Sequence, residues 1–322
     1  GDIGRITLSG TAVIRNCHAK DASDLFGGGI SDAGTLTISG NVKIIGCTAG
    51  GMGTDAMYVN ANNGSSITGG TFYGSVQDPG NKISGLIVTY HLNNDKNYAT
   101  QVLQPGDQIT LPDPAKPGCT FDGWYKDGTK WDSTTPVNEN LTLTGWLYKG
   151  VSTADEFTAA MNDDSTDVIR LTKDIIVSSN SLKAIQNNRK VTLDLNGYVL
   201  DLGADNIRIG GNANNGTLTI MDSRPEVEHK FRDDGTGLWV WDKTSGDKLV
   251  KGGIIIGSTG GNSAIHAGGS GGKVIMNGGN IVGHETGDGG GAVSITNGGR
   301  FTMNAGSIVG CYASGTGGGV YL

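Results

Sequence analysis

Short runs of alternating apolar residues recur along the chain, and Gly, Asn or Asp breaks each run after three to five positions. Alternation places every second side chain on one face of a β-strand, and Gly, Asn and Asp are typical turn residues. The pattern therefore predicts many short strands joined by tight turns. A helix is predicted only near residues 153–162, because Thr153 and Glu156 fit a capping box there. Its apolar face would hold Phe157, Ala160 and Met161.

The strand pattern repeats at a fixed offset in the second half of the chain. Residues 274–283 recur at 301–310 with an offset of 27. The same offset relates residues 191–195 to residues 218–222. A repeat of this length with short strands and Gly turns is typical of one coil of a right-handed parallel β-helix, in which neighbouring coils complete each other's backbone hydrogen bonds. The offset predicts these stacked pairs: Val191 with Leu218, Leu193 with Ile220, Val274 with Phe301, Met276 with Met303, Ile281 with Ile308 and Val293 with Val320.

A related repeat begins near the N-terminus, where residues 6–10 recur at 36–40 with an offset of 30. Cys17 and Cys47 stand at equivalent positions of this repeat. Coils stacked about 4.8 Å apart would bring the two sulfurs within disulfide reach, and two stacked free thiols are the other reading. The offset also predicts these stacked pairs: Ile6 with Leu36, Leu8 with Ile38 and Ile14 with Ile44.

Residues 86–148 interrupt the repeats, lose the Gly periodicity and contain five of the seven Pro and three of the five Trp. Their marker residues are Tyr90, Pro105-Gly106-Asp107, Leu111-Pro112, Pro114, Pro117-Gly118, Phe121-Asp122-Gly123-Trp124-Tyr125, Asp127-Gly128, Leu141-Thr142-Leu143 and Trp146. This succession resembles the Listeria–Bacteroides repeat, also called the internalin B-repeat. The sequence departs from that family at Cys119, where an aromatic residue is usual, and at Gly145, which is commonly Ala. The resemblance implies a small β-grasp-like module of bacterial surface proteins and no catalytic residues.

The fold class predicted from these features is all-β, with two segments of right-handed parallel β-helix and a small β-grasp-like module between them. We expect a first β-helix at residues 1–85, the module at 86–148 and a second β-helix at 149–322, with a capping helix near 153–162 and a hairpin insertion near 223–251. From residue 167 onward the chain also resembles β-helical surface proteins of Gram-positive and gut bacteria, including predicted adhesins. That resemblance implies a fold and a location more than an activity.

The insertion at 223–251 holds the densest group of aromatic and charged residues in the repeat segments. Alternation in Leu238-Trp239-Val240-Trp241-Asp242 places both Trp on one face of a strand, and Asp-Asp-Gly and Ser-Gly-Asp are plausible hairpin turns. Exposed paired Trp would form a stacking platform for sugar rings or a protein hot spot. The alternative is that both Trp pack on the flank of the β-helix and hold the insertion down. The candidate ligand-binding residues are Trp239, Trp241, Phe231, Asp233 and Asp234.

Composition supports a folded repeat protein. Gly accounts for 56 of the 322 residues, Pro for 7 and charged residues for 17%, which is too Gly-rich for an ordinary domain and too Pro-poor for collagen. The net charge of -7, without a Lys/Arg cluster, speaks against nucleic acid as a partner and against an anionic membrane surface. No apolar run reaches the roughly 18 residues of a membrane span. The start inside a repeat leads us to expect a mature or excised fragment of a secreted protein.

Catalytic and metal sites are not expected. A glycosidase needs two convergent carboxylates, whereas Asp163-Asp164 and Asp233-Asp234 stand in turn-like contexts in which Asp commonly accepts backbone N–H groups. Gly-His-Gly and Arg-Ile-Lys motifs are absent, and the five His lack the spacing of metal ligands. No cofactor is expected.

The preferred hypothesis is a bacterial surface or secreted repeat protein that acts as a stalk and adhesin. It would be extracellular, attached to the cell surface, and would bind a host or matrix glycan or protein. The alternatives are a carbohydrate-active enzyme on a β-helix, either a polysaccharide lyase or a glycosidase, and a purely structural spacer.

Overall fold

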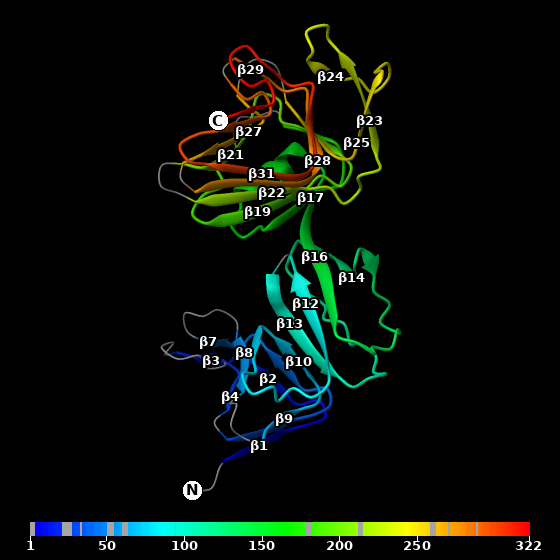
Figure 1. Ribbon diagram of the computed structural model, residues 1–322, viewed down its shortest axis with the longest axis vertical. Helices are drawn as coiled ribbons and strands as arrows, with labels where there is room; N and C mark the ends of the chain where they lie inside the picture. Colours follow the sequence, from blue (N-terminus) through cyan, green and yellow to red (C-terminus); the bar gives the residue numbers. More distant parts are fainter. Residues whose placement is uncertain are drawn as a thin grey trace. The chain divides into compact units, whose positions relative to one another are not determined.

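The computed structural model describes residues 4–20, 28–32, 34–49, 55–59, 64–93, 95–177, 182–211, 215–257, 262–269, 271–287 and 289–322 (Figure 1). Within these ranges the regular elements are β-strands and one helix, as the predicted all-β class requires. The chain divides into two compact units, one formed by Gly1–Lys116 with Phe121–Leu147 and the other by Pro117–Thr120 with Tyr148–Leu322. Across the described residues, helices long and apolar enough to cross a membrane are absent.

The first unit begins with strands that stack in parallel. Their bounds are β1 (Arg5–Leu8), β2 (Val13–Arg15), β3 (His18–Ala19), β4 (Ile30–Asp32), β5 (Thr35–Ile38), β6 (Lys43–Ile45), β7 (Thr48–Ala49), β8 (Asp55–Val59), β9 (Ser66–Ile67), β10 (Gly70–Tyr73) and β11 (Ser75–Gln77). They pair as β1-β5-β9, β2-β6-β10, β3-β7 and β4-β8-β11, each strand with the one from the next repeat. The three apolar pairs predicted from the N-terminal repeat are confirmed: Ile6 with Leu36, Leu8 with Ile38 and Ile14 with Ile44.

Both cysteines of this repeat are free thiols at stacked positions. The amide of Thr48 donates to the carbonyl oxygen of Cys17 at 2.9 Å, so the chain is in register on either side of the pair. Cys17 is exposed and Cys47 is buried. Burial raises the pKa of the Cys47 thiol, and the adjacent Cys17 sulfur adds to the increase.

The rest of the first unit is a mixed sheet. It contains β12 (Leu86–Leu92), β13 (Asp95–Leu103), β14 (Thr120–Lys126), β15 (Thr129–Lys130) and β16 (Leu141–Val151). Strand β12 pairs with β16 in parallel and with β13 antiparallel, while β14 joins β16 and β15. Strand β13 also pairs antiparallel with β10, so the sheet continues from the stacked strands that precede it.

Trp124 is the centre of this sheet's core and is 1% exposed. Its indole Nε1 donates to the carbonyl oxygen of Pro112 at 2.7 Å, and Tyr90 meets it edge-on at 4.9 Å between ring centroids. A Cβ atom at Gly145 would lie 2.8 Å from the ring of Phe121 and 2.9 Å from that of Trp124. Gly at this position therefore makes room for two aromatic rings.

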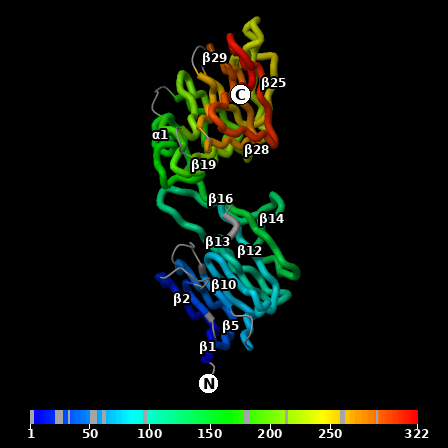
Figure 2. The backbone as a smooth tube through the Cα atoms, turned by 60° about the vertical axis from the view of Figure 1, so that its left-hand side comes forward, coloured from blue at the N-terminus to red at the C-terminus, as the bar shows by residue number. Residues whose placement is uncertain are grey.

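The second unit repeats the parallel stacking. Its strands outside the insertion are β17 (Val168–Leu171), β18 (Ile175–Ile176), β19 (Arg189–Asp194), β20 (Val199–Asp201), β21 (Ile207–Gly210), β22 (Gly216–Met221), β26 (Ile254–Ile256), β27 (Ile265–Gly268), β28 (Gly272–Val282), β29 (Glu285–Thr286), β30 (Val293–Ile295), β31 (Arg300–Val309), β32 (Tyr312–Ala313) and β33 (Val320–Tyr321). The stacks are β16-β17-β19-β22-β28-β31, β18-β20-β26-β28, β21-β27-β30-β33 and β29-β32. Figure 2 shows the backbone of this unit returning to the same positions in successive layers.

The register of the second unit follows the offset read from its sequence repeat. All six stacked pairs predicted for this part of the chain are confirmed. Leu218 pairs with Val274 although the whole insertion lies between them in the sequence, because the insertion adds chain without changing the stack. The core of the unit is a continuous cluster of buried aliphatic side chains.

Helix α1 (Ala154–Asn162) buries Phe157, Ala160 and Met161 against this core. The Thr153 hydroxyl accepts from the Glu156 amide at 3.2 Å, as a capping box requires. The Glu156 carboxylate accepts from the amide and hydroxyl of Ser152.

Arg189 closes the other end of this helix. Its guanidinium donates to the carbonyl oxygens of Met161, Ala160 and Asp163, which are among the acceptors that a helix C-terminus leaves without intrahelical partners.

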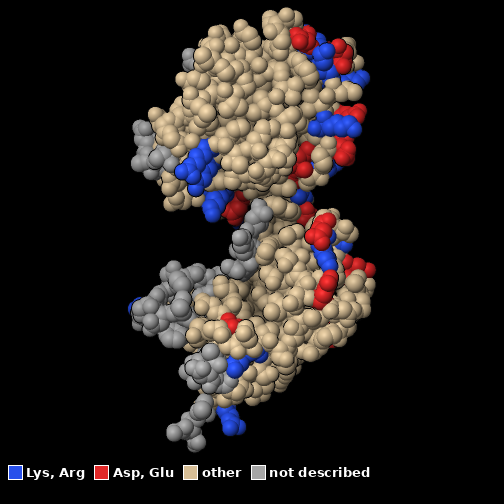
Figure 3. All heavy atoms as spheres, viewed as in Figure 1, with Lys and Arg blue, Asp and Glu red and all other residues tan. Residues whose placement is uncertain are grey.

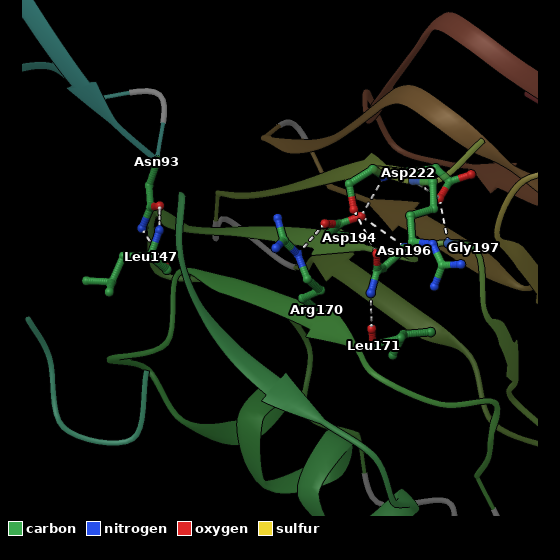
Figure 4. Close-up of polar contacts among 10 residues, drawn as sticks. Asn93, Leu147, Arg170, Leu171, Asp194, Asn196, Gly197 and Asp222 are labelled. Atoms are coloured by element: carbon green, nitrogen blue, oxygen red, sulfur yellow. Dashed lines mark hydrogen bonds and ion pairs between the residues drawn. The ribbon is translucent and has the colours of Figure 1, made fainter. Parts of the chain in front are cut away.

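A buried turn network joins successive repeats of the second unit (Figure 4). The Asp194 carboxylate is completely buried and accepts from Arg170 Nε at 2.6 Å and from the amides of Asn196 and Ser223. The Asn196 side chain donates to the carbonyl oxygen of Leu171 one repeat earlier. The Asp194 carboxylate and the Leu171 carbonyl oxygen thus each accept a hydrogen bond from a neighbouring repeat.

Asp222 extends the network by another repeat. Its carboxylate accepts from the amides of Gly197 at 2.7 Å and Gly253 at 2.6 Å. The insertion therefore leaves and re-enters the stack at a turn that is tied to both neighbouring turns.

We predict that Asp194→Asn destabilises the second unit by about 3–5 kcal/mol, because it leaves the buried Arg170 guanidinium without its counter-charge. Urea denaturation followed by circular dichroism measures the loss. The matched control is Asp234→Asn, at an exposed carboxylate, which should change the free energy of unfolding little. An equal change in the free energy of unfolding for the two variants would show that the ion pair between Arg170 and Asp194 contributes nothing to stability.

His284 makes the stability of this unit depend on pH. Its ring is 2% exposed, and neither ring nitrogen has a hydrogen-bond partner among the described residues. Burial lowers the pKa of His284 from 6.5 to about 4. The unfolded chain therefore binds a proton at a higher pH than the folded chain, and stability falls as the pH decreases from 6.5 toward 4.

The expected loss over this interval is about 3 kcal/mol. The variant His284→Leu should show a flatter dependence of the free energy of unfolding on pH between these limits. Urea titrations at half-unit pH steps compare the two proteins. Parallel pH profiles for wild type and variant would refute the assignment to His284.

Candidate functional site

The insertion forms a small antiparallel sheet beside the stacked strands of the second unit (Figure 1). Its strands are β23 (Glu228–Asp233), β24 (Trp239–Trp241) and β25 (Lys248–Lys251), in the order β24-β23-β25. Strand β23 pairs Phe231 with Trp241 and Asp233 with Trp239. The sheet thus brings four of the five candidate residues onto two neighbouring strands, and Asp234 follows directly.

Phe231 anchors the insertion to the stack. Its side chain is completely buried, and together with Val250 it packs on Val199, Ile254 and Val282. A Phe side chain buried from water contributes roughly 1.5–3 kcal/mol. Phe231 therefore supports the surface from below instead of forming part of it.

Trp239 rests on two stacked glycines. Gly283 and Gly310 occupy equivalent positions of successive repeats and have φ angles of 62° and 56°. A Cβ atom at Gly310 would overlap the Trp239 ring, and one at Gly283 would overlap the Trp239 carbonyl oxygen. The Trp239 amide donates to the carbonyl oxygen of Gly310 at 3.0 Å. The absence of side chains at these two glycines therefore lets β24 pack directly on the stack.

Trp241 lies two residues further along the same strand and is half-buried, like Trp239. Both rings pack against the cluster around Phe231. The Lys243 ammonium stands 4.1 Å from the centroid of the Trp241 ring and 3.0 Å from the Asp174 carboxylate. The Trp pair thus packs on the flank of the stack, and the outer part of Trp241 is covered by a cation.

The Asp233 and Asp234 carboxylates are exposed and shape their own loop. Asp233 accepts from the amides of Gly235 at 2.7 Å and Gly237 at 3.2 Å. Asp234 accepts from the hydroxyl and amide of Thr236, which together hold the pKa of Asp234 below its ordinary value.

A groove of about 570 Å³ lies where the insertion meets the stack. Arg224 stands over the ring of Tyr198 at 5.9 Å, and His229 Nε2 is 2.9 Å from the carbonyl oxygen of Gly197. We call it the insertion groove; its lining residues are Lys173, Asp174, Gly197, Tyr198, Arg224, Val227 and His229.

Charge gathers around this part of the unit. Figure 3 shows acidic and basic side chains concentrated on the side that carries β23, β24 and β25, while the neighbouring face is largely uncharged. Of the groove-lining residues, Lys173 and Arg224 are exposed cations and Asp174 is held by Lys243. The groove therefore offers positive charge beside an aromatic ring.

The sequence analysis did not single out Tyr198, Arg224 or Lys173. Tyr198 stands in the turn Asn196-Gly197-Tyr198, and Arg224 comes just before a proline. An aromatic residue directly after a turn was the available signal for Tyr198. No sequence pattern could have predicted that Arg224 lines a groove, because its position depends on how the insertion folds back on the stack.

Groups of three or more His, Cys, Asp or Glu side chains able to hold a metal ion are absent from the described part of the chain.

Comparison with known protein families assigns two regions. Residues 87–145 match the Listeria-Bacteroides repeat domain. Residues 148–229 match a pectate lyase-like adhesive domain. The chain joins a surface-type repeat module to an adhesive-type domain. The two matches confirm the family resemblances predicted from the sequence, and the second ends inside β23. Neither the curated proteins nor the solved structures contain a match to this chain.

The second matching family is described as adhesive. This description fits a repeat protein that acts through its surface, and it gives no support to an enzyme.

A double-mutant cycle can test the packing of Trp239 against Gly310. Gly310→Ala should destabilise the second unit, because the new methyl group enters the space of the Trp239 ring. The same change in a Trp239→Gly background keeps the backbone strain at residue 310 and removes the clash, because both the ring and the Cβ of Trp239 lie within 2.6 Å of the added methyl group. We expect a coupling energy of about 1–3 kcal/mol from urea denaturation of the four proteins. Additive effects would mean that the ring does not rest on this glycine.

Proposed function

We propose that this protein is an extracellular bacterial surface protein that serves as a stalk and adhesin for a host or matrix glycan or protein. The match to an adhesive domain over residues 148–229 carries the proposal. The Listeria-Bacteroides repeat domain beside it supports a surface location, because such modules are strung along bacterial surface proteins. The net charge of -7 suits a solvent-exposed protein that avoids nonspecific association.

The architecture that we propose for the stalk is a right-handed parallel β-helix on each side of a β-grasp-like module. Residues 1–85, 86–148 and 149–322 would be the three domains. Support comes from parallel pairing at one-repeat offsets in several separate stacks, such as β1-β5-β9 and β21-β27-β30-β33. An array of this kind lengthens by adding coils, since each coil contacts only its neighbours. Length and stiffness are the properties that a stalk needs.

The insertion is the recognition element in this proposal. Phe231, Trp239 and Trp241 pack the small sheet on the stack, Trp241 stays partly exposed, and Asp233 and Asp234 shape the exposed loop. The insertion groove lies at its base, with Tyr198 as an aromatic surface and Arg224 as a hydrogen-bond donor. An aromatic ring beside a guanidinium is a common combination at the centre of protein interfaces. The same pair suits a sugar ring that carries polar groups.

A carbohydrate-active enzyme is less well supported. Asp174 is the one carboxylate among the groove-lining residues, and it is paired with Lys243 at 3.0 Å. A glycosidase needs a second carboxylate to share the work of acid and base.

The binding role predicts the effect of two variants. Tyr198→Ala and Trp241→Ala should each weaken binding to the cognate glycan or matrix protein by about 10- to 30-fold, as the loss of a central aromatic contact does. A glycan array and a matrix-protein panel identify the ligand first, and surface plasmon resonance then measures the variants. Lys43→Gln, an exposed position of the first unit, is the matched control.

Two outcomes would count against this proposal. Wild-type affinity in both variants would remove the insertion as the recognition element. Absence of binding across both panels would favour the structural spacer.

A further inference from the structure

A second groove lies on the sheet β21-β27-β30-β33, away from the residues that line the insertion groove. Its volume is about 420 Å³. The lining residues are Asn206, Arg208, Asn262, Ser263, His266, Thr286, Gly289, Ser294, Thr296 and Tyr321. They come from four successive layers of the stack, so the groove runs across the strands.

Four of these residues form one column. Strand pairing places Arg208 beside His266, His266 beside Ser294, and Ser294 beside Tyr321. Their chain neighbours Ile207, Ile265 and Val293 face the core and are completely buried, so alternation directs the column outward. Three strand spacings of about 4.8 Å give the column a length of roughly 14 Å. We call these four residues the polar column.

The groove is built from hydrogen-bonding side chains on a firm base. Asn206, Ser263 and Ser294 are 7%, 5% and 8% exposed, so they are held in place by packing. The Ser263 hydroxyl contacts the carbonyl oxygen of Gly289 at 3.3 Å. A concave surface with a few fixed polar groups is the usual form of a small-ligand site.

Arg208 supplies the charge of the groove. It is the single residue with a permanent charge among those that line it, and no lining residue is acidic. Nη2 donates to the carbonyl oxygen of Leu182 at 2.9 Å, which orients the guanidinium and uses one of its five N–H groups. The fork of an oriented guanidinium matches a carboxylate in a bidentate pair.

His266 and Tyr321 complete the chemistry. Burial, together with the charge of Arg208, lowers the pKa of His266, so its imidazole is neutral near pH 7 and can donate and accept. His266 Nε2 stands 3.4 Å from the Thr296 hydroxyl. The ring of Tyr321 is 39% exposed and lies against Gly289. Its open face can stack on the apolar face of a sugar ring.

We propose that the polar column binds an oligosaccharide whose sugars carry a carboxylate. Arg208 pairs with the carboxylate of the sugar, and Tyr321 stacks on a face of the sugar ring. The sugar hydroxyls form hydrogen bonds with His266, Ser294 and the neighbouring Thr296. Strand addition by a peptide is confined to the edge strands β21 and β33 of this sheet, because β27 and β30 beneath the centre of the groove are paired on both sides. The adhesive-domain match ends at residue 229, so three of the four column residues lie outside it. The proposal does not depend on the insertion groove.

The test uses the full chain and three carboxylate-bearing probes with different backbones: hyaluronan hexasaccharide, trigalacturonate and sialyllactose. Each is compared with its carboxyl-reduced form by isothermal titration calorimetry. We expect at least one acidic probe to bind and its reduced form to bind about 10- to 100-fold more weakly, as the loss of a charged hydrogen-bonded pair implies. A hexaglutamate peptide tests whether any carboxylate suffices.

Variants locate the binding. Arg208→Gln should lower the affinity for the acidic probe by about 10- to 100-fold. Arg208→Lys should lower this affinity less, and Tyr321→Ala should lower it roughly tenfold. Tyr321 stands in the last strand and is exposed, so its removal keeps the proposal testable if Arg208→Gln unfolds. Lys43→Gln, at an exposed position of the first unit, is the control and should leave this affinity unchanged.

Four results would overturn the proposal. They are no binding of any acidic probe, equal binding of the reduced forms, equal binding of hexaglutamate, and wild-type affinity in both Arg208→Gln and Tyr321→Ala.

Discussion

Each strand of the two stacks completes its backbone hydrogen bonds with the strand one repeat away, and this pairing constrains the rest of the molecule. It fixes the repeat length, because after every circuit the chain must reach the equivalent position one strand spacing further along the stack. It also places side chains of equivalent positions on top of each other, as Leu218 lies between Val191 and Val274. Apolar positions become continuous ladders in the core. A polar position inside the stack must find its partner in a neighbouring repeat, which is what Asp194 and Asp222 do.

The same constraint decides where variation is tolerated. Chain added between two strands leaves the stack intact if both ends return to register, and the insertion does so at a turn held by Asp222. The added sheet must also pack on the stack, and the stacked glycines Gly283 and Gly310 leave the space in which Trp239 does so. Recognition by such a protein is a property of turns and outward columns, because the inward positions are committed to the core. The two grooves illustrate the two possibilities, one at an inserted turn and one along an outward column.

The first unit solves its packing differently after the stacked strands end. Aromatic side chains around Trp124 fill the space above a mixed sheet, and Gly145 leaves room for their rings. This is a core of its own type, separate from the aliphatic clusters of the stacked strands. The adhesive-domain match begins at residue 148, just after this module. The two matches thus follow each other along the chain as separate regions.

Composition and periodicity alone determined the all-β class, the position of the helix and the register of the stacked strands. The two repeat offsets are readable because stacking demands the same side chain type at the same place in each repeat. Tertiary structure decided which face of the insertion is covered: Phe231 and both Trp turn toward the stack, which alternation alone cannot distinguish from an outward face. It also assembled the polar column, whose members Arg208, His266, Ser294 and Tyr321 are unevenly spaced along the chain. The 27-residue offset relates Ser294 to Tyr321, but the step from His266 to Ser294 is 28 residues and the step from Arg208 to His266, which contains the insertion, is 58 residues. A single fixed period therefore does not reveal the whole column.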